Sequence, residues 1–229
     1  MIRRPPRSTL DRSSAASDVY KRQVEQEYND WYNQEHLYER LSVPGILSAA
    51  RYESVTNGPK HLAIYELENV KVLESTEYLN FKKYPSDWSR RMSPEIVGTT
   101  YIRNVYVMIH PEIMTKSHSE SGMAEAIQIG RMNIPNHVEE RWNHWYNTIY
   151  IPNYETVPGI IKGRRFKTIE GTPKYMTLYE MTSQESSKSA EWDEQQNAHP
   201  LNASMRSAME HIDGSPGIWV KTFEVNKQN

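Results

Sequence analysis

The sequence predicts an α+β fold in which two tandem copies of a β-α-β-β-α-β unit lie along one chain of 229 residues. The first observation behind this prediction is an internal repeat. Residues 28–67 align without a gap on residues 142–181, at an offset of 114, with thirteen identities. The second observation is the order of strand-like and helix-like patterns in the second copy. Together they predict two similar modules of about a hundred residues each.

The identities of the repeat include rare residue types, which makes a chance match untenable. The matched positions include Trp31-Tyr32-Asn33 on Trp145-Tyr146-Asn147, Val43-Pro44-Gly45-Ile46 on Val157-Pro158-Gly159-Ile160, Arg51 on Arg165, Pro59-Lys60 on Pro173-Lys174, and Tyr65-Glu66 on Tyr179-Glu180. Because tryptophan, proline and glycine recur at one register, the two copies are expected to share one local structure.

The second copy gives the element order. Strands are predicted by alternating apolar residues and by β-branched or aromatic content, and turns by Pro-Gly pairs. In chain order we expect a strand over 124–132, a helix over 137–150, a turn at 157–159, strands over 160–168 and 174–181, helices over 184–196 and 200–211, and a strand over 218–225. This order is the ferredoxin-like split βαβ motif.

The first copy is expected to lack its opening strand. That strand should lie over about residues 11–20, but the first 23 residues resemble a translated sequencing adaptor. They are therefore set aside from the fold, and Met1–Ser17 are predicted to be disordered. In the motif the first strand is central, so its loss would leave two neighbours with unpaired backbone groups. The predicted division is module 1 over 24–110, a linker over 111–122 and module 2 over 123–229.

Composition narrows the function classes. The chain has no cysteine, which excludes disulfides, thiolate catalysis and cysteine metal sites. The net charge is −2, and it becomes −6 once the basic first 23 residues are removed, so nucleic acid is not expected as a partner. No apolar run of 18 residues occurs, so no membrane span is predicted, and the cytoplasm is the expected location. The histidines show no metal-ligand spacing, and neither a metal nor a cofactor is expected.

Two tethered modules, each with one apolar sheet face, should pack these faces together as two stacked sheets or as a shared barrel. Covalent fusion would then replace the association of two separate chains, giving an intramolecular pseudo-dimer. Further homo-oligomers are compatible with this arrangement.

The pattern Trp31-Tyr32-Asn33-x-Glu35-His36, followed by Val43-Pro44-Gly45 and Arg51-Tyr52, resembles the dimeric α+β barrel superfamily. It is most similar to the EthD-like and antibiotic-biosynthesis-monooxygenase-like branches. The resemblance covers about residues 24–110 and 124–226. It implies the barrel fold specifically, whereas members differ widely in their reactions and include cofactor-free oxygenases, isomerases and haem-degrading enzymes.

His36 is the sharpest candidate for chemistry. Tyr28, Tyr32 and His36 follow each other at intervals of four on the first helix and should share one face. An imidazole among aromatic rings at a pocket mouth could act as a general base on a phenolic or dicarbonyl substrate. The alternative is a packing stripe with His36 at its wet end. In the second copy Tyr150 takes the place of His36, so at most one copy keeps the base.

The other candidates accompany this stripe. Arg51 could hold an anionic substrate, or could pair with Glu66 across the hairpin, and Arg165 could pair likewise with Glu180. Tyr65 could donate a hydrogen bond to a bound oxygen or simply pack in the core. Asn33 and Asn147 are expected to bond local backbone at the helix end. The remaining predicted substrate-binding residues are aromatic or basic: Tyr28, Trp31, Tyr32, Trp142, Trp145, Tyr146, Tyr150, Arg165 and Tyr179.

Three functions follow as hypotheses. The first is a small-molecule-binding enzyme, a cofactor-free monooxygenase or isomerase for an aromatic or polyketide-like substrate, with His36, Arg51 and Tyr65 as catalytic residues. The second is a non-catalytic ligand-binding or scaffold protein of the same fold. The third is a haem-binding or haem-degrading protein, with His36 or His199 as the axial ligand. The first gains if His36 and Arg51 line one cavity, and the second gains if both are packed away.

Overall fold

A computed structural model describes residues 23–111 and 122–226, and it confirms the α+β class. We call these two ranges the first half and the second half. The first half contains a helix over 23–31, η1 (Tyr32–His36), α2 (Leu37–Ser42), β1 (Ile46–Ser54), β2 (His61–Leu67), η2 (Val70–Glu74), α3 (Thr76–Lys83), α4 (Asp87–Met92), α5 (Pro94–Val97) and β3 (Val105–His110). The second half contains β4 (Ala126–Asn133), α7 (Asn136–Trp145), η3 (Tyr146–Tyr150), α8 (Ile151–Glu155), β5 (Ile160–Glu170), β6 (Tyr175–Met181), η4 (Gln184–Lys188), α9 (Ala190–Gln195), α10 (Asn202–Ser207), β7 (Glu210–His211) and β8 (Gly217–Asn226).

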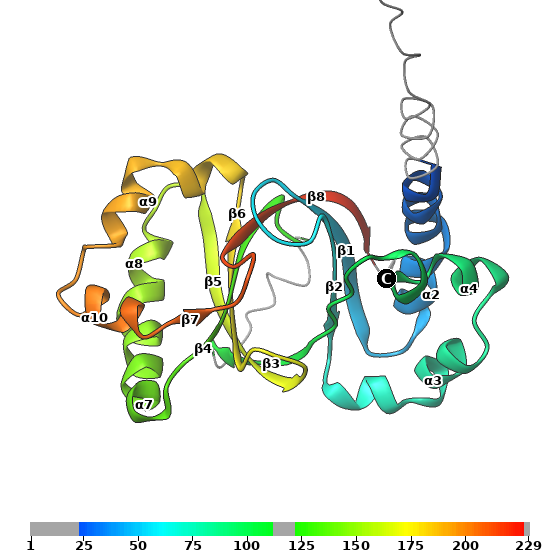
Figure 1. Ribbon diagram of the computed structural model, residues 1–229, viewed down its shortest axis with the longest axis horizontal. Coiled ribbons are helices and arrows are strands. Elements are labelled where there is room, and N and C mark those ends of the chain that lie inside the picture. Colours follow the sequence, from blue (N-terminus) through cyan, green and yellow to red (C-terminus); the bar gives the residue numbers. More distant parts are fainter. Residues whose placement is uncertain (1–22, 112–121, 227–229) are drawn as a thin grey trace, which may run out of the picture.

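One antiparallel sheet runs through both halves as a half-barrel. Its strand order is β2-β1-β8-β4-β6-β5-β3, and β7 pairs separately with β4. Two strand pairings join the halves, because β8 of the second half pairs with β1, and β3 of the first half pairs with β5. Figure 1 shows β8 crossing from one half to the other above the sheet interior, with helices on the two outer sides. The β1–β8 and β3–β5 pairings thus join the two halves through backbone hydrogen bonds.

Most predicted elements of the second copy are found within two or three residues of their expected ends. The prediction of a helix over 200–211 is wrong at its end, since the helix stops at Ser207 and Glu210–His211 form the short strand β7. This strand pairs with Met132 and Asn133 of β4, so sheet pairing overrides the local helical pattern there. The predicted disorder of Met1–Ser17, the opening strand near 11–20 and most of the linker at 111–122 lie outside the described residues.

A π-helical turn interrupts the first helix of each half at the same repeat position. Tyr32–His36 and Tyr146–Tyr150 are both π-helical, and they are separated by the offset of 114. A π turn adds one residue to a helical turn and shifts the direction of the side chains that follow. The repeat therefore holds at the level of a rare backbone feature that the sequence pattern did not reveal.

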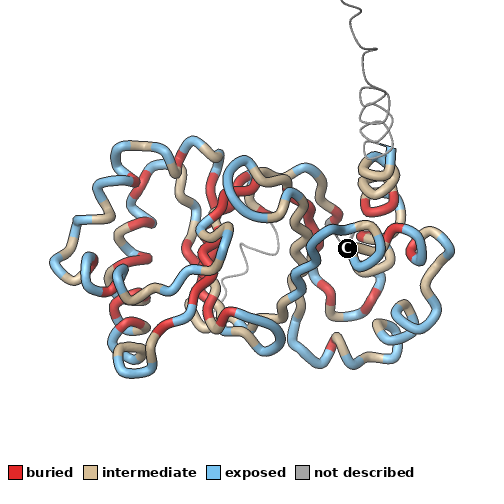
Figure 2. Tube along the Cα trace, viewed as in Figure 1, coloured by how far each residue is buried: buried red, intermediate tan, exposed pale blue. Residues whose placement is uncertain are grey.

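Apolar side chains of the described residues gather in three large cores and one small cluster of Ala126, Met181 and Ile218, because strand residues alternate between the two faces of the sheet. Two cores lie between the helices and the outer face, one around Trp31 in the first half and one around Trp142 in the second. The third lies on the inner face between the halves and includes Tyr52 and Trp219. Figure 2 shows the buried positions concentrated in the strands and in α7 and α8, with exposed positions along the outer loops.

The predicted Pro-Gly turns are confirmed at Gly45 and Gly159, which have φ of 88° and 84°. This left-handed region is open to glycine at little cost. Space is also short, because a Cβ at Gly159 would lie 2.2 Å from Ser186 Oγ, and one at Gly45 would lie 2.5 Å from Val72 Cγ2. Glycine is thus required twice over where the helix turns back into the sheet.

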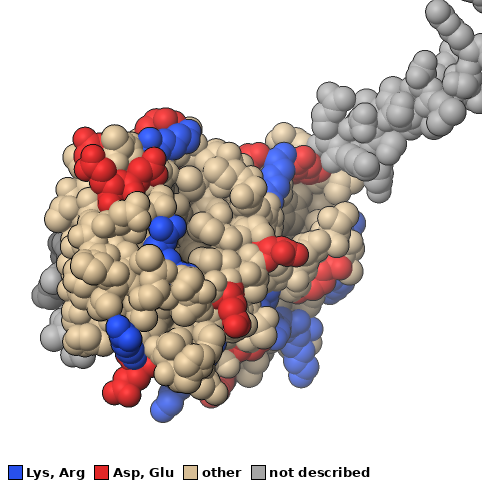
Figure 3. Space-filling view, turned by 60° about the vertical axis from the view of Figure 1, so that its left-hand side comes forward, with Lys and Arg blue, Asp and Glu red and all other residues tan. Residues whose placement is uncertain are grey.

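Acidic and basic side chains are interspersed over the face drawn in Figure 3, with a group of acidic side chains at its upper left. Among the helices that the structure describes, none is both long enough and apolar enough to cross a membrane.

Candidate functional site

The predicted residues Arg51, Tyr28 and Tyr32 come together beneath the first helix. Arg51 Nη2 donates to Asn29 Oδ1 at 2.7 Å, and Nη1 donates to Asn33 Oδ1 at 3.1 Å. The guanidinium lies 4.6 Å from the ring centroid of Tyr32 and 5.5 Å from that of Tyr28. Burial lowers the pKa of Arg51. Two amide oxygens and two aromatic faces therefore solvate this cation.

Arg165 has the same surroundings in the second half. Its guanidinium donates to Asn143 Oδ1 at 2.6 Å and to Asn147 Oδ1 at 2.5 Å. It lies 4.4 Å from the ring centroid of Trp142 and 4.7 Å from that of Tyr146. Arg165 is fully buried, and this burial lowers its pKa to about 10. The two clusters, which we call the arginine cores, hold a guanidinium between the helix and the outer face of the sheet.

Two sequence predictions about these residues are wrong. Arg51 does not pair with Glu66, because Arg51 lies opposite Ala63 on β2 and bonds the helix instead. Asn33 and Asn147 do not cap the backbone through their side-chain oxygens, which accept from the two arginines. The alternation of strand side chains explains the first error, since neighbouring residues such as Tyr65 and Glu66 face opposite sides of the sheet.

The two helix tryptophans pack into the arginine cores and are anchored by their indole nitrogens. Trp31 Nε1 donates to Ser89 Oγ at 3.1 Å, and Trp145 Nε1 donates to Asn202 Oδ1 at 3.0 Å. Both side chains are 1% exposed. Each indole therefore joins the first helix of its half to a later helix, through α4 or α10.

His36 and Tyr150 take the same place in the two cores. The His36 ring lies 4.3 Å from the Trp31 ring, and the Tyr150 ring lies 4.4 Å from the Trp145 ring, at nearly equal tilts. Arg40 Nε donates to His36 Nε2 at 3.5 Å, a long hydrogen bond. The His36 ring is thus packed against Trp31 and Arg40 and does not line the pocket described below.

Burial, together with the nearby charges of Arg40 and Arg51, lowers the pKa of His36 to about 3. The imidazole is therefore neutral at pH 7 and is a weak base. Accepting a proton from a phenol, whose pKa is about 10, would be uphill by about 1.4 kcal/mol for each unit of the difference in pKa. The geometry and the pKa both weigh against His36 as a general base.

Tyr65 and Tyr179 lie on the outer face of the sheet, each in the arginine core of its own half. Burial raises the pKa of both phenols. Tyr154 and Trp192 stand against Tyr179 with ring centroids 5.4 Å away in each case. The predicted catalytic and substrate-binding residues thus lie in two separate packed cores, and none of them lines the pocket described below.

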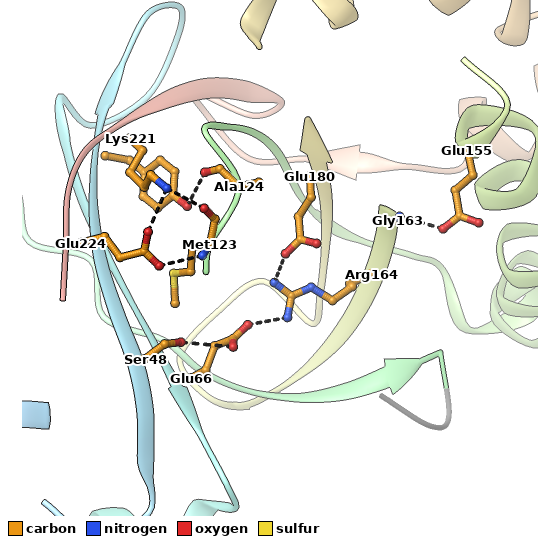
Figure 4. Close-up of polar contacts among 11 residues, drawn as sticks. Ser48, Glu66, Met123, Ala124, Glu155, Gly163, Arg164, Glu180, Lys221 and Glu224 are labelled. Atoms are coloured by element: carbon orange, nitrogen blue, oxygen red, sulfur yellow. Dashed lines mark hydrogen bonds and ion pairs between the residues drawn. The ribbon is translucent and has the colours of Figure 1, made fainter. Parts of the chain in front are cut away.

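The inner face of the sheet carries a different cluster, which the sequence reading missed. Arg164 Nη1 donates to Glu66 Oε1 at 2.6 Å, and Arg164 Nη2 donates to Glu180 Oε1. Ser48 Oγ donates to the other oxygen of Glu66 at 3.2 Å. Figure 4 shows the guanidinium between the two carboxylates, which come from β2 and β6. One cation therefore joins the two halves across the barrel interior.

Glu66 and Glu180 occupy matching positions of the repeat, but Arg164 matches Ala50. The barrel interior thus has two equivalent carboxylates and a single arginine between them. A usable signal was present in the sequence, because Glu66 and Glu180 recur next to Tyr65 and Tyr179 and must face the opposite side of the sheet. Arg164 was not predicted, because only its neighbour Arg165 has a matching arginine, Arg51, in the first copy.

A pocket of about 330 Å³ opens beside these carboxylates. Its walls come from β2, β5, β6, β8 and the segment before β4. The lining residues are Glu66, Gly122, Met123, Ala124, Glu125, Ile161, Glu180, Thr182 and Lys221. Three carboxylates and one ammonium line the wall, so the pocket has an excess of hydrogen-bond acceptors with negative charge.

Lys221 fixes one wall of this pocket. Its Nζ donates to the carbonyl oxygen of Met123 at 2.7 Å and contacts Glu125 at 2.7 Å and Glu224 at 2.8 Å. Glu224 in turn accepts from the Met123 N–H at 2.7 Å, as Figure 4 shows. The segment before β4 is therefore held against β8 through both the N–H and the C=O group of Met123.

No group of three or more histidine, aspartate or glutamate side chains within residues 23–111 and 122–226 has the geometry to hold a metal ion. His199, a candidate for haem ligation, accepts from the backbone N–H of Leu201 through Nδ1 at 3.2 Å. Neither His199 nor His36 lines the pocket.

The fold is shared with a protein of known structure. A structure described as an anthrone oxidase-like protein superposes with a TM-score of 0.55 and 12% identity, over 89% of each chain. A "putative monooxygenase" from Fusobacterium nucleatum has a TM-score of 0.47 at 8% identity, covering 93% of this chain and 88% of the other. One of the same description from Lactobacillus acidophilus has a TM-score of 0.43 at 11% identity, covering 92% and 90%. No family model and no curated protein sequence matches the chain. At these identities the first likeness shows a common α+β barrel fold.

Proposed function

We propose that the chain binds a small hydroxylated aromatic molecule in the barrel pocket, with Glu66 and Glu180 accepting its hydroxyl groups. The observation that carries the proposal is the pair of equivalent carboxylates beside a pocket of about 330 Å³. That volume lies at the small end of ligand pockets, which suits a molecule of two or three fused rings.

The charges favour a ligand that donates hydrogen bonds. Arg164 compensates part of the charge of Glu66 and Glu180, and Glu125 adds a third carboxylate on the other wall. An anionic ligand would meet this negative charge directly, whereas a phenol would donate its O–H groups to the carboxylate oxygens. Such charge-assisted hydrogen bonds are about twice as strong as neutral ones.

The apolar part of the lining suits a flat ring system. Met123, Ala124 and Ile161 face the pocket between the charged side chains. A methionine thioether adapts to aromatic faces and contacts them favourably. The ligand would thus place its rings against the apolar wall and its hydroxyls against the carboxylates.

Calorimetric titration with 1,3-dihydroxynaphthalene and with 1,3-dimethoxynaphthalene tests this proposal, since methylation removes both hydrogen-bond donors, adds two methyl groups and leaves the ring system unchanged. We expect the diol to bind and the diether to bind at least about tenfold more weakly. Glu66→Gln should weaken binding of the diol by about tenfold or more, while Glu185→Gln, an exposed site, should leave it unchanged. Equal binding of the two compounds would refute the proposal.

A second candidate is oxidation of such a ligand by dioxygen. The specific observation is the fold shared with an anthrone oxidase-like protein. In an anthrone the methylene between two rings is acidic, and loss of a proton gives an anion that reacts with O2. The balanced overall change is anthrone plus O2 to anthraquinone plus water. In this chain a pocket carboxylate would be the acceptor of the proton, and the three residues predicted from sequence, His36, Arg51 and Tyr65, remain the competing assignment.

Incubation of the protein with anthrone in air, followed by absorbance of the quinone, separates binding from turnover. Loss of turnover in Glu66→Gln with retention in His36→Ala would assign the base to the pocket. Loss of turnover in His36→Ala with retention in Glu66→Gln would instead assign the base to His36 in the arginine core of the first half. Binding without turnover above the protein-free rate would identify a non-catalytic binding protein, and a Soret band after haem titration would support the haem alternative.

A further inference from the structure

Six aromatic rings of the second half follow one another in contact, and we call them the ring chain. In order they are Trp192, Tyr154, Tyr150, Tyr146, Trp142 and Tyr175. Successive ring centroids are 4.3, 4.8, 5.0, 5.1 and 5.1 Å apart, so neighbouring rings touch. Because electron transfer between two rings falls off exponentially with the gap between them, an unbroken chain can pass an electron in a series of short steps.

One end of the ring chain lies behind the pocket. The ring centroid of Tyr179 is 5.4 Å from those of Trp192 and Tyr154, and Tyr179 immediately precedes Glu180 on β6. Glu180 lines the pocket, and successive strand residues face opposite sides of the sheet. The ring chain therefore begins on the outer side of a strand that forms one wall of the pocket.

The other end of the ring chain has an acceptor for a proton. The Tyr175 hydroxyl donates to Oε1 of Glu139, whose side chain is 19% exposed. A phenol that loses an electron becomes a strong acid, so a carboxylate in hydrogen-bond contact can take its proton as the electron leaves. Tyr175 is then left as a neutral radical, and Glu139 can return the proton to water.

Trp142, the ring before Tyr175, is a poor place for a positive charge to stay. The Arg165 guanidinium lies 4.4 Å from its ring centroid, and Trp142 Nε1 has no hydrogen-bond partner among the described residues. The neighbouring cation raises the free energy of a positive charge on the indole, and without an acceptor the indole cannot shed its proton. Oxidation of Trp142 is therefore passed on to Tyr175.

The same series of rings is broken in the described part of the first half. At the repeat offset Arg40 stands in the place of Tyr154, and Tyr78 stands in the place of Trp192. The Arg40 guanidinium lies 5.1 Å from the Tyr78 ring centroid, where the second half has two rings in contact. A guanidinium is far harder to oxidise than a phenol, so the two halves share their packing but differ in this property.

We propose that the ring chain is a path for one-electron transfer that carries oxidising equivalents away from the pocket wall to Tyr175. The oxidant gains one electron, Tyr175 loses one, and the phenolic proton goes to Glu139. An aryloxyl or peroxyl radical is the class of oxidant that fits, and it is reduced to the corresponding anion. Attack of dioxygen on the phenolic ligand of the proposed function is one source of such radicals, and only this choice of source rests on that function. The path protects the pocket from oxidative damage.

A photo-oxidant attached at one chosen place tests the proposal. The chain has no cysteine, so Glu191→Cys allows a ruthenium bipyridine label to be attached beside Trp192 alone. Glu77→Cys is the matched control, because position 77 lies at the repeat offset from 191, beside Tyr78, and both glutamates are exposed. A flash with an external electron acceptor oxidises the label, which then takes one electron from the protein. Transient absorbance and electron paramagnetic resonance follow the tyrosyl radical.

With the label at position 191 we expect a long-lived tyrosyl radical that Tyr175→Phe removes. Glu139→Gln should shorten the lifetime of this radical, because the amide cannot hold the proton, whereas Glu140→Gln, at an exposed carboxylate of the same helix, should leave it unchanged. Trp142→Phe keeps a ring in place but removes one that can be oxidised, so the Tyr175 radical should be lost. With the label at position 77, Tyr175→Phe should change nothing.

Three results would overturn the proposal. They are a radical that survives Tyr175→Phe with the label at position 191, a Tyr175 radical that persists in Trp142→Phe, and equal formation of the Tyr175 radical from both labels. Glu139→Gln alters a partly exposed side chain, so an unchanged radical lifetime in that variant would also count against the path even if a core variant failed to fold. The label supplies the oxidant, so every result is independent of whether a phenol binds in the pocket.

Discussion

Arg164 and Glu66 are separated by 98 residues in the chain and are joined by a hydrogen bond of 2.6 Å in the barrel interior. The bond connects β5 of the second half to β2 of the first, on the face of the sheet that the helices do not cover. Glu180 accepts from the other terminal nitrogen of Arg164, so a single guanidinium holds a carboxylate from each half. Glu66 and Glu180 also line the pocket, which couples its shape to the junction of the halves.

Replacing Arg164 by methionine should therefore destabilise the protein strongly. The side chains of Glu66 and Glu180 are 20% and 9% exposed, and without the guanidinium both would be charged, poorly hydrated and mutually repelling. Breaking a buried pair by removing one partner costs about 3–5 kcal/mol. We expect a loss of that order in the free energy of unfolding, measured with urea at pH 7.

The triple variant R164M, E66Q, E180Q is the control for this prediction. It removes the charges together with their partner, so most of the lost stability should return. If the triple variant is no more stable than Arg164→Met alone, lost packing around the arginine stem would be the cause, and the electrostatic account would be wrong.

Acid should destabilise the protein through His36. The pKa of this imidazole is lowered from 6.5 to about 3 in the folded protein. Well above pH 6.5 the imidazole is neutral in both the folded and the unfolded state, so its titration does not change the stability. Between pH 6.5 and 3 the unfolded chain binds a proton that the folded chain does not, so the stability contributed by the neutral ring is lost as the pH falls. From pH 7 to pH 5 this loss should be about 2 kcal/mol.

His36→Tyr provides a matched control, because tyrosine stands at the equivalent position 150 in the same ring environment. The variant should lose about 2 kcal/mol less than the natural chain between pH 7 and pH 5, by urea unfolding at each pH. Identical pH dependence of the two proteins would show that His36 is accessible to protons when folded.

The sequence was informative wherever the two copies agree. The repeat and its strand and helix patterns predicted the α+β class and the ring contacts on the first helices, because core packing recurs in both copies. The barrel cluster was missed since its arginine has no counterpart, Ala50 standing at the matching position. Two adjacent arginines, Arg164 and Arg165, also leave open which one faces inward until the strand register is known. The matched residues therefore include both the scaffold and the two pocket carboxylates, whereas the arginine that joins these carboxylates has no counterpart in the repeat.

Substitution of Gly159 by alanine should destabilise the turn between α8 and β5 by two separable effects. The φ of 84° is strained for an L-residue, at about 1–2 kcal/mol. The new Cβ would also stand 2.2 Å from Ser186 Oγ. Combining Gly159→Ala with Ser186→Gly removes the closest contact but leaves the strain and Thr182 Oγ1 at 3.0 Å from the new Cβ, so urea unfolding of the double variant should show partial recovery beyond the effect of Ser186→Gly alone. Full recovery would mean that backbone strain is absent.

Arg165→Lys should give a variant whose defect shrinks as the pH rises. Lysine cannot donate to Asn143 and Asn147 together in the planar geometry of the guanidinium, so we expect the free energy of unfolding to fall by about 1–3 kcal/mol at pH 7.

The site lowers the pKa of its cation through burial, as the value of about 10 for Arg165 shows. Arginine stays charged regardless, but a lysine there would release its proton in the folded state below its unfolded pKa. The unfolded chain would then bind more protons, so stability would increase with pH. Urea unfolding should therefore show a smaller difference in the free energy of unfolding between the variant and the natural chain at pH 9 than at pH 7. An equal difference at both pH values would mean that the lysine ammonium is hydrated in the folded protein and keeps its proton.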